Sequence, residues 1–456
     1  MTDTISIRKG LDIPISGTAS LLLTDARSIT TYAVKPTDFV GLTPRLMVEE
    51  GNTVNVGDAL FVDKHDERIR FTSPVSGHVK AIVRGEKRKL LEVVVEADYK
   101  SAGSMGSDCK SSPTPQTADE IKAAMLQCGL WTMLRQRPFG TIANPDDNPK
   151  TIFVSAFDSA PLAPDYDFAL QGKETFFFKG IETLSKLTVG KVHVCFRPSQ
   201  KLAEQLSTLN SQLSTHIIKG PHPSGNIGTQ IAHIDPINKS EVVWTMNAQD
   251  VAVLGELVMT GIYRPEKVIA VAGPQIKDPH YYRIIAGACT EAIVAKQIES
   301  DLMNHRVISG NVLSGTQIEA NGFVGAYDNM VTLLPEGDYY DFMGWLMPGF
   351  RKFSFSRTFF SGFIPKMLNW KFDTNTHGDV RPLVFTGNFE RVFPFDIYPT
   401  QLIKACIVGD IDLMENLGIY EMEPEDFALC EFIDTSKTDI QAIIREALEK
   451  LRKEAM

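Results

Sequence analysis

Between residues 151 and 261, short apolar runs alternate with stretches of helical period, and this alternation constrains the fold more than any other feature of the chain. Because parallel strands are joined by long crossovers that are usually helices, this order predicts a doubly wound parallel sheet. Ligands of such sheets bind at the carboxyl ends of the strands. The expected strands are 151–157, 191–196, 215–219 and 241–246, and the expected helices are 178–187, 200–209 and 247–261, the last with Asn247 as a candidate cap.

A glycine loop follows the strand at 215–219 and leads into a helix that we expect to begin near Gly228. A strand, a glycine loop and a helix together cradle phosphate in many proteins. The spacing of Gly220, Gly225 and Gly228 nevertheless matches neither G-x-G-x-x-G nor G-x-x-x-x-G-K-S/T. The prolines at 221 and 223 also remove two backbone donors. We interpret the loop as a tight turn between packed elements.

The N-terminal part predicts β-structure throughout. A lead segment, 1–39, holds short β-like runs and is followed at 40–98 by apolar runs punctuated by glycine. Within 40–98, VEEGNTVNVGDALFVDK and FTSPVSGHVKAIV resemble the two halves of a biotinyl/lipoyl carrier β-sandwich. In such carriers a lysine at the hairpin tip bears the cofactor, and Lys64 is the candidate here, although KHDERIRF makes the hairpin longer. The sandwich is therefore either an interaction module or a carrier modified on Lys64.

The remaining chain divides by composition. Residues 99–117 are rich in Gly, Ser and Pro and predict a linker. Thr117 or Asp119 is expected to cap a helix that buries one face and ends at Gly129. Residues 263–335 read as short strands, and 336–456 combine a Phe/Pro-rich segment with C-terminal helices. The last of these helices carries an amphipathic face that needs a partner: Ile440, Ile443, Ile444, Ala447, Leu448 and Leu451.

Composition excludes several classes of function. The 456 residues are 43% hydrophobic with a net charge of −10, which argues against nucleic acid as the main partner. No run of about 18 apolar residues predicts a membrane span, and the N-terminus lacks the apolar core of a signal peptide. The six cysteines contain no C-x-x-C, so we expect reduced cytoplasmic thiols rather than an Fe–S or structural zinc site. No motif supports a hydrolase or a metalloenzyme.

Motifs along the whole chain resemble the A subunit of the sodium-translocating NADH:quinone oxidoreductases of bacteria. The stretches that carry the resemblance are IRKGLDIPISG (7–17), GLWTMLRQRPF (129–139), VSAFDSAPLAPD (154–165), KGPHPSGNIGTQI (219–231), LVMTGIY (257–263), VAGPQIKDP (271–279), VISGNVLSGTQ (307–317), LMPGFRKFSFSRTF (346–359), GNFERVFPFDIYPTQLI (387–403) and EPEDFALCEF (423–432). That family is similar to the flavin subunit of complex I and to the C subunit of the Rnf complex.

The resemblance implies a multidomain α/β protein. Its parts would be the biotinyl/lipoyl-like sandwich, a Rossmann-like domain at 118–262, a β-grasp (soluble-ligand-binding) domain at 263–335 and a helical C-terminus. The chain would lie peripherally at the cytoplasmic face of the bacterial inner membrane, bound to the other subunits and especially to the B subunit in the membrane. The whole complex couples electron transfer from NADH to ubiquinone with sodium export, and it uses FMN, FAD, riboflavin and Fe–S centres.

Two departures from the flavin-carrying relatives imply that this chain itself holds no cofactor. Those relatives have a glycine-rich loop where backbone approaches the flavin, whereas this chain has GLWTMLRQRPFG with bulky Trp131, Leu134 and Phe139. They also carry clustered cysteines near the C-terminus, where this chain has Cys430 alone. The alternatives left open are a lipoyl- or biotin-type carrier, a soluble flavoprotein on a complex I-like scaffold, and a purely structural subunit.

The same stretch supplies our candidate site. Trp131, Arg135, Arg137 and Phe139 combine apolar walls with donors, as a quinone headgroup requires, and His222 is a further candidate donor. The competing interpretation is a packed loop whose arginines pair with acidic neighbours, and a solvated histidine. Asp158 and Asp165 follow a predicted strand, at the edge where open α/β sheets bind ligands. We expect Asp158 to cap a turn.

Overall fold

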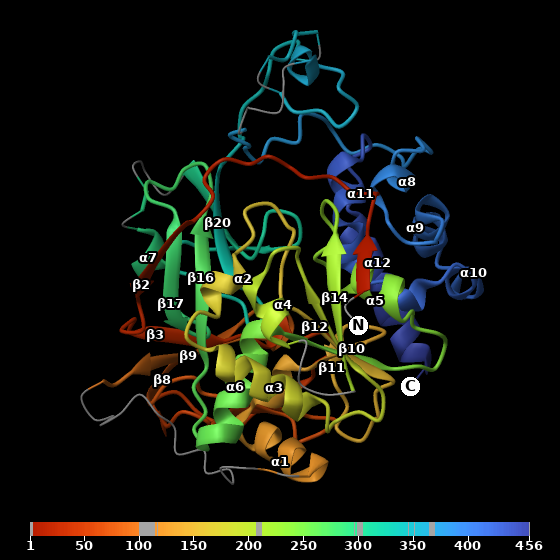
Figure 1. Cartoon of the computed structure of the whole chain (residues 1–456). Coiled ribbons are helices and arrows are strands. Elements are labelled where there is room, and N and C mark those ends of the chain that lie inside the picture. Colours follow the sequence, from red (N-terminus) through yellow and green to blue (C-terminus); the bar gives the residue numbers. More distant parts are fainter. Residues whose placement is uncertain are drawn as a thin grey trace.

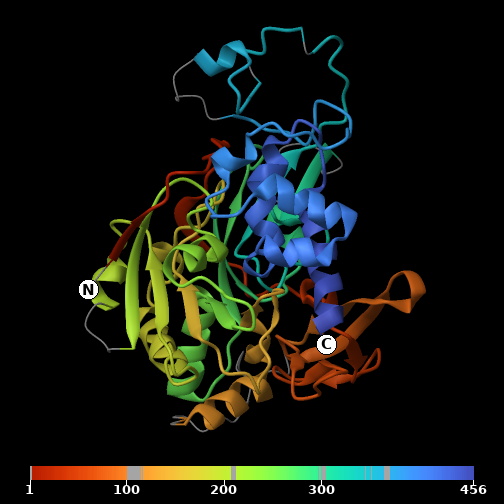
Figure 2. The same ribbon diagram turned by 90° about the vertical axis from the view of Figure 1, so that its right-hand side faces the viewer.

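The computed structural model describes residues 3–99, 115, 117–206, 212–295, 297–298, 304–344, 346–350, 352–363 and 370–455. Most of the predicted linker at 99–117 therefore lies outside the described residues. The described chain forms a parallel sheet, a mixed sheet, a small β-sandwich and a group of C-terminal helices (Figure 1). Figure 2 shows these helices, in blue, covering strands of the mixed sheet.

The β-sandwich is built from two antiparallel sheets, as the glycine-punctuated pattern predicted. One contains β3 (Thr31–Val34), β9 (Leu90–Ala97), β8 (Gly77–Arg84) and β5 (Thr53–Val54), and the other β4 (Pro44–Leu46), β6 (Ala59–Asp63) and β7 (Arg70–Thr72). Lys64 is exposed directly after β6. The tip beyond it is tethered to another part of the chain, because Arg68 Nη2 lies 2.7 Å from both Asp66 Oδ2 and Asp146 Oδ2.

The lead segment is distributed over three sheets. β1 (Asp3–Ser6) pairs in parallel with a strand of the parallel sheet, β2 (Ser20–Asp25) pairs in parallel with a strand of the mixed sheet, and β3 belongs to the sandwich. The pairings of β1 and β2 join residues more than 200 positions apart in the chain. The first 34 residues therefore fasten the other parts together.

The alternation at 151–261 forms the parallel sheet that it predicts. Its order is β1, β14 (Leu213–Lys219), β13 (Val192–Phe196), β12 (Thr151–Ser155), β15 (Val243–Asn247), β10 (Arg135–Arg137) and β11 (Thr141–Ile142). The strands from β1 to β15 are parallel, and β10 and β11 add antiparallel strands at the β15 edge. Along the chain, β13 and β14 extend the sheet on one side of β12 and β15 on the other, so the winding reverses between β12 and β15.

The helices around this sheet follow their sequence signals. α1 (Ala118–Cys128) begins at a Thr117 capping box and ends at Gly129 in the left-handed conformation, and α6 (Ala248–Thr260) begins at an Asn247 cap. α6 packs on α3 (Glu174–Leu184), and glycines let the two backbones approach closely because a Cβ on Gly255 would lie 1.8 Å from Phe176 O. The shorter helices are α2 (Tyr166–Ala169), α4 (Lys201–Leu206) and α5 (Ile227–Ile234).

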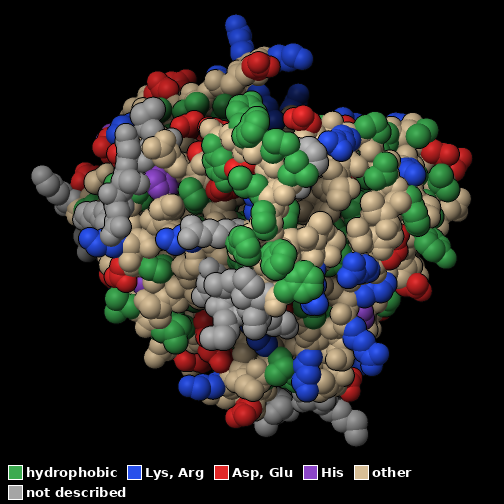
Figure 3. Space-filling model, turned by 90° about the horizontal axis from the view of Figure 1, so that it is seen from above, with side chains coloured by type: hydrophobic (Ala, Val, Ile, Leu, Met, Phe, Trp, Pro, Cys, Tyr) green, Lys and Arg blue, Asp and Glu red, His purple; other side chains and the backbone are tan. Residues whose placement is uncertain are grey.

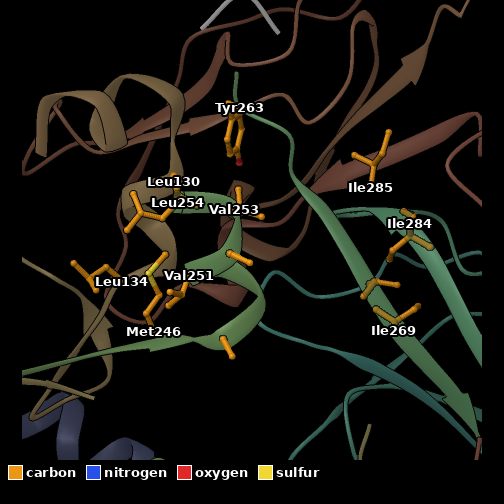
Figure 4. Close-up of a cluster of buried hydrophobic side chains, with 14 of the residues drawn as sticks. Leu130, Leu134, Met246, Val251, Val253, Leu254, Tyr263, Ile269, Ile284 and Ile285 are labelled. Carbon is orange, nitrogen blue, oxygen red and sulfur yellow. The ribbon is translucent and has the colours of Figure 1, made fainter. Parts of the chain in front are cut away.

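The mixed sheet lies beside α6 and is buried on both faces. Its order is β19 (Thr316–Ile318), β18 (His305–Ser309), β20 (Met330–Pro335), β16 (Glu266–Ala272), β17 (His280–Ile285) and β2. Side chains alternate across a strand, so Ile269 and Val271 of β16 enter the core around α6, and Val268 and Ala270 enter the core under the C-terminal helices. Figure 4 shows the first of these cores, where Val251 and Leu254 of α6 lie among side chains of both sheets.

The amphipathic C-terminal helix finds its partner within the chain. α12 (Ile440–Ala455) buries the predicted apolar stripe, apart from the half-buried Ile443, against α9 (Pro399–Val408) and α11 (Ala428–Ile433). This core continues onto Val268, Ala270 and Met330 of the mixed sheet. The remaining helices are α7 (Glu291–Val294), α8 (Phe389–Val392) and α10 (Ile411–Asn416).

Candidate functional site

A cleft of about 380 Å³ opens where the winding of the parallel sheet reverses. Its floor is formed by the carboxyl ends of β12 and β15, at Ser155 and at Thr245 to Asn247. The glycine loop, the loops of the mixed sheet and the C-terminal helices supply the walls. Open α/β sheets bind their ligands at this position, because the loops that follow two adjacent strands run to opposite sides of the sheet there and leave a crevice between them.

A hydrogen-bonded group fixes the floor of the cleft. The hydroxyl of Tyr166 accepts from Asn247 Nδ2 at 2.9 Å and from Asn329 Nδ2 at 3.1 Å. Burial raises the pKa of Tyr166, and the nearby carboxylate of Asp158 raises it further. Tyr166 therefore stays protonated at neutral pH and offers its own O–H as a donor. The group joins α2, the end of β15 and the mixed sheet at one point.

Arg135 carries the most unusual contact in the cleft. Its guanidinium lies over the ring of Tyr327, 5.1 Å from the centroid, which is a favourable cation–π arrangement. Its Nε is buried and has no hydrogen-bond partner among the described residues. A buried donor without a partner costs free energy unless something else accepts from it. Arg135 therefore places a guanidinium beside an aromatic wall of the cleft, and one buried donor of that group has no acceptor among the described residues.

The cleft is richer in carboxylates than in cations. Arg135 and Arg445 are the Lys or Arg residues among its described lining, and Arg445 Nη2 is engaged by Glu423 Oε2 at 2.9 Å. Asp38 is paired with Lys35, Glu423 with Arg445 and Glu425 with Arg137, and a cleft whose charges are largely balanced is compatible with a neutral ligand. The lining carboxylates are Asp38, Asp158, Asp328, Glu423 and Glu425.

The structure does not bring the five predicted quinone-site residues together. Arg135 alone among them lines the cleft. Trp131 is fully buried against Trp244, with ring centroids 5.5 Å apart, and its indole Nε1 donates to Ala143 O at 2.7 Å. Arg137 is buried in ion pairs with Glu425, at 2.8 Å, and Asp426, at 3.2 Å. For Arg137 the competing interpretation, pairing with acidic neighbours, describes the observed contacts.

Phe139 and His222 lie in other contacts. Phe139 packs edge-on against Tyr420, with ring centroids 6.0 Å apart. His222 is buried rather than solvated: its Nδ1 lies 3.1 Å from Ser159 Oγ, and its backbone N–H donates to Asp12 Oδ1 at 3.0 Å. Burial lowers the pKa of His222 to about 4, so the ring is neutral at pH 7. His222 fastens the glycine loop to the lead segment.

The two aspartates cap turns. Asp158 Oδ1 accepts from Ala160 N at 2.8 Å, as expected, while its side chain also lines the cleft, and burial raises its pKa. Asp165 is the N-cap of α2 and accepts from Asp167 N at 2.9 Å. The glycine loop makes the predicted strand-to-helix turn between β14 and α5, and Gly225 packs against Ser159, where a Cβ would lie 2.4 Å from the backbone nitrogen.

Sequence reasoning missed most of the cleft. Tyr166, Tyr327, Asn329 and Arg445 come from parts of the chain that no motif connects. Asn247 was identified as a helix cap, which it is, but its place beside the reversal point depends on the strand order. A rule that examined the last residue of every predicted strand would have found Phe157 and Met246, which both line the cleft.

Three family models match the chain. They are described as the NqrA N-terminal barrel-sandwich hybrid domain, over residues 5–98, the NqrA second alpha/beta domain, over 116–263, and the NQRA C-terminal domain, an SLBB domain, over 268–320. None of the helices in the described part of the chain has the length and apolarity that a membrane-crossing segment requires.

Curated relatives match over nearly the full length. The A subunit of the Na(+)-translocating NADH-quinone reductase of Serratia proteamaculans is 37% identical, covering 99% of this chain and 100% of the relative. The A subunits of the same reductase from Yersinia pseudotuberculosis and Pasteurella multocida are 36% and 37% identical with the same coverage. Among solved structures, an air-oxidized NAD+-reducing NiFe-hydrogenase matches 75% of this chain and 68% of its own at 12% identity with a TM-score of 0.39, a likeness too small to support an inference.

Proposed function

The chain belongs to the family of A subunits of the Na(+)-translocating NADH-quinone reductases, and from this premise we propose that it is the peripheral, cofactor-free subunit of such a complex. The complex couples electron transfer from NADH to ubiquinone with sodium export. This subunit docks on the membrane subunits, especially the B subunit, at the cytoplasmic face of the inner membrane. It neither binds NADH nor transfers hydride, and its share of the reaction is a quinone site.

The local structure supports the absence of flavin. In the flavin-carrying relatives, a glycine-rich loop brings bare backbone to the flavin. Here the corresponding residues form a short 3-10 helix, Leu130–Met133, followed by β10, which pairs with the edge of β15, and both Trp131 and Leu134 are buried. Cys430 is fully buried, and burial raises the pKa of its thiol, which disfavours the thiolate that an Fe–S centre needs.

Arg135 carries the quinone proposal. A quinone headgroup is a flat, neutral ring with two carbonyl acceptors, so it binds between apolar walls with donors at its edges. The guanidinium of Arg135 is such a donor, it lies over the ring of Tyr327, and Met133 and Phe157 also line the cleft. The Tyr166 hydroxyl supplies a second donor from the floor. Of the five residues named from sequence, this site retains Arg135, and we assign Trp131, Arg137, Phe139 and His222 to its supporting structure.

Binding of a short-chain ubiquinone to the purified full-length chain, measured by calorimetry, tests this site. Arg135→Met keeps the volume and removes the donor, and since a hydrogen bond from a charged group contributes about 1.5–3 kcal/mol, the affinity should fall about tenfold or more. The matched control is Arg391→Met, because Arg391 also lies over an aromatic ring, Phe355 at 4.4 Å, outside the cleft. Equal affinity of wild type and Arg135→Met would remove the site.

Absorption spectroscopy tests the proposal that the chain binds no flavin and no Fe–S centre. The absorption spectrum of the purified chain should contain neither flavin nor Fe–S bands, and a stoichiometric flavin would favour the soluble-flavoprotein alternative. For the carrier alternative, the tether from Arg68 to Asp146 opposes a freely swinging hairpin. The intact mass should therefore equal that of the unmodified sequence, whereas a lipoyl or biotinyl adduct on Lys64 would favour the carrier.

The finer fold names also belong to this proposal. The reversal between β12 and β15 and the crossover helices support a Rossmann-like domain, which we place at 118–262. The mixed sheet with its β16–β17 hairpin supports a β-grasp domain at 263–335.

A further inference from the structure

A long loop leaves the body of the molecule after β20 and returns to it before residue 372. We call residues 338–371 the apolar finger, of which the structure describes 338–344, 346–350, 352–363 and 370–371. In Figures 1 and 2 it projects from the top of the molecule, the end toward which the arrowheads of β1 and β14 point. Because parallel strands share one direction, this is also the end at which the cleft opens.

The root of the finger is fixed to the body. Gly337 N donates to Thr374 Oγ1 at 2.9 Å, and Asn375 Nδ2 donates to Gly337 O at 2.9 Å and to Tyr339 O at 2.8 Å. The ring of Phe353 packs on Phe432 of α11, with centroids 6.0 Å apart. The projection is thus an anchored element, and its direction is set by the core beneath it.

The outer part of the finger exposes large apolar side chains that contact little of the chain. Figure 3, which looks down on this end, shows hydrophobic side chains gathered there. Phe342 is 87% exposed and Phe363 is 81% exposed, far more than aromatic residues on an ordinary surface. The other strongly exposed members are Tyr340, Leu346, Met347, Phe350 and Phe360.

The charge of the finger is opposite to that of the rest of the molecule. Residues 338–371 contain five Lys or Arg (351, 352, 357, 366 and 371) and two Asp (338 and 341), which gives 5 − 2 = +3. The whole chain carries −10, so the remainder carries −10 − 3 = −13. Arg357 and Lys371 are exposed. An anionic surface would attract the finger and repel the rest of the molecule.

Aromatic side chains together with basic residues suit the interface of a lipid bilayer. Aromatic rings partition to the headgroup level, and Lys and Arg add attraction to anionic lipids. A preformed protein interface is instead a packed, complementary patch with few charges at its centre. The exposed rings of the finger make loose contacts with one another, with Phe360 centred 5.6 Å from Phe350 and 6.0 Å from Phe363, and they share the finger with basic residues, so the lipid surface is the better match.

We propose that the apolar finger is a membrane-interface anchor whose exposed aromatic and aliphatic side chains insert into the headgroup region of an anionic bilayer. The anchor would hold the chain at the membrane in addition to any contact with other subunits. It is independent of the quinone site, since the cleft can bind a short-chain quinone in buffer without any lipid.

Flotation of the purified full-length chain with vesicles tests the anchor. We expect the wild type to float with vesicles of phosphatidylcholine mixed with phosphatidylglycerol, and about tenfold less with phosphatidylcholine alone or in high salt. Phe342→Ser with Phe363→Ser should reduce binding about tenfold, because the apolar area available for insertion is lost. Arg357→Gln with Lys371→Gln should weaken binding to anionic vesicles and leave the weak binding to neutral vesicles unchanged.

Matched control variants distinguish binding by the finger from nonspecific hydrophobic binding to vesicles. Val189→Ser with Met259→Ser removes two other exposed apolar side chains, 91% and 43% exposed, outside the finger, and binding should not change. All four variant positions in the finger are surface positions, and unchanged melting temperatures verify folding. The lipid anchor is refuted if the wild type fails to float with anionic vesicles, or if the finger variants float like the wild type. The exposed side chains of the finger would then be assigned to an interface with a protein.

Discussion

Replacing Arg137 with methionine should weaken the junction between the parallel sheet and the C-terminal helices. Arg137 is buried at the end of β10, where it neutralises Glu425 and Asp426 of the segment before α11. The side chain of Asp426 is completely buried, and its Oδ1 already lacks a hydrogen-bond partner among the described residues. Methionine preserves most of the packing volume, so the main effect is the loss of the compensating charge.

The size of the effect follows from the burial. Removing one partner of a buried ion pair costs about 3–5 kcal/mol, since the other charge is left in a low-dielectric environment. For a cooperative unit of about 150–250 residues, each kcal/mol lowers the melting temperature by about 2–4 °C, which gives a loss of roughly 6–20 °C. Adding Asp426→Asn should recover most of this loss, because the amide oxygen can still accept from Glu423 N, now 2.9 Å from Asp426 Oδ2.

The loss of stability in Arg137→Met should depend on pH in a defined direction. Burial raises the pKa of Asp426 above its ordinary value of 3.8, and the charge of Arg137 opposes that rise. A carboxyl whose pKa is higher in the folded than in the unfolded state binds more protons when folded, so folding is favoured as pH falls toward 3.8. Without Arg137, its positive charge no longer opposes the rise in the pKa of Asp426. Arg137→Met should therefore lose more stability near pH 8 than near pH 5.5.

Calorimetric melting of the wild type, Arg137→Met and the double variant over this pH range measures all three expectations. A melting temperature for Arg137→Met within about 2 °C of the wild type near pH 8 would contradict the estimate. So would a loss that grows toward acid pH, because the buried carboxylate would then not be the source of the cost.

Three further outcomes follow from local geometry. Gly255→Ala places a Cβ 1.8 Å from Phe176 O and should cost at least about 1–3 kcal/mol in thermal unfolding by separating α3 from α6, whereas Gly378→Ala, whose nearest atom is 3.8 Å away, should be neutral. Thr117→Ala removes the capping box of α1 and should cost about 1 kcal/mol in denaturant unfolding, and Thr117→Ser should retain it. Burial and the adjacent His216 lower the pKa of His193 to about 4, so stability should fall as pH drops from 6.5 toward 4; His193→Gln should make that fall shallower in pH-dependent melts.

Local sequence signals predicted the individual helices and strands well, but they predicted poorly how these elements pair with one another. The cap at Thr117, the C-cap at Gly129 and the buried stripe of α12 depend on contacts within a few residues, and the structure contains all of them. The lead segment depends on pairing between distant residues, such as Asp3 with His216 and Arg283 with Asp25. Short β-like runs carry no mark of their partner, so the distribution of this segment over three sheets could not be read from sequence.

In the candidate site, too, local features were visible in the sequence and long-range contacts were not. The aromatic and basic character of 129–139 was visible, and it directed attention to Arg135. Which of two neighbouring arginines faces the cleft depends on the geometry of β10 and on where that strand ends. Arg135 lies over Tyr327, while Arg137 meets Glu425 and Asp426 from more than 280 positions away. Nothing in the sequence near Arg137 indicates that these carboxylates will reach it.

The cleft and the apolar finger lie at the same end of the molecule. Ubiquinone carries an apolar tail and resides in the bilayer, so a quinone site on a peripheral chain must face the membrane. The parallel strands end toward the finger, and the cleft lies at those ends (Figure 1). If the finger holds the chain at the membrane, as proposed, the cleft opens toward the lipid surface. On this geometry, finger variants should weaken the use of long-chain quinone in vesicles while leaving the binding of a short-chain quinone in buffer unchanged, whereas Arg135→Met should weaken both.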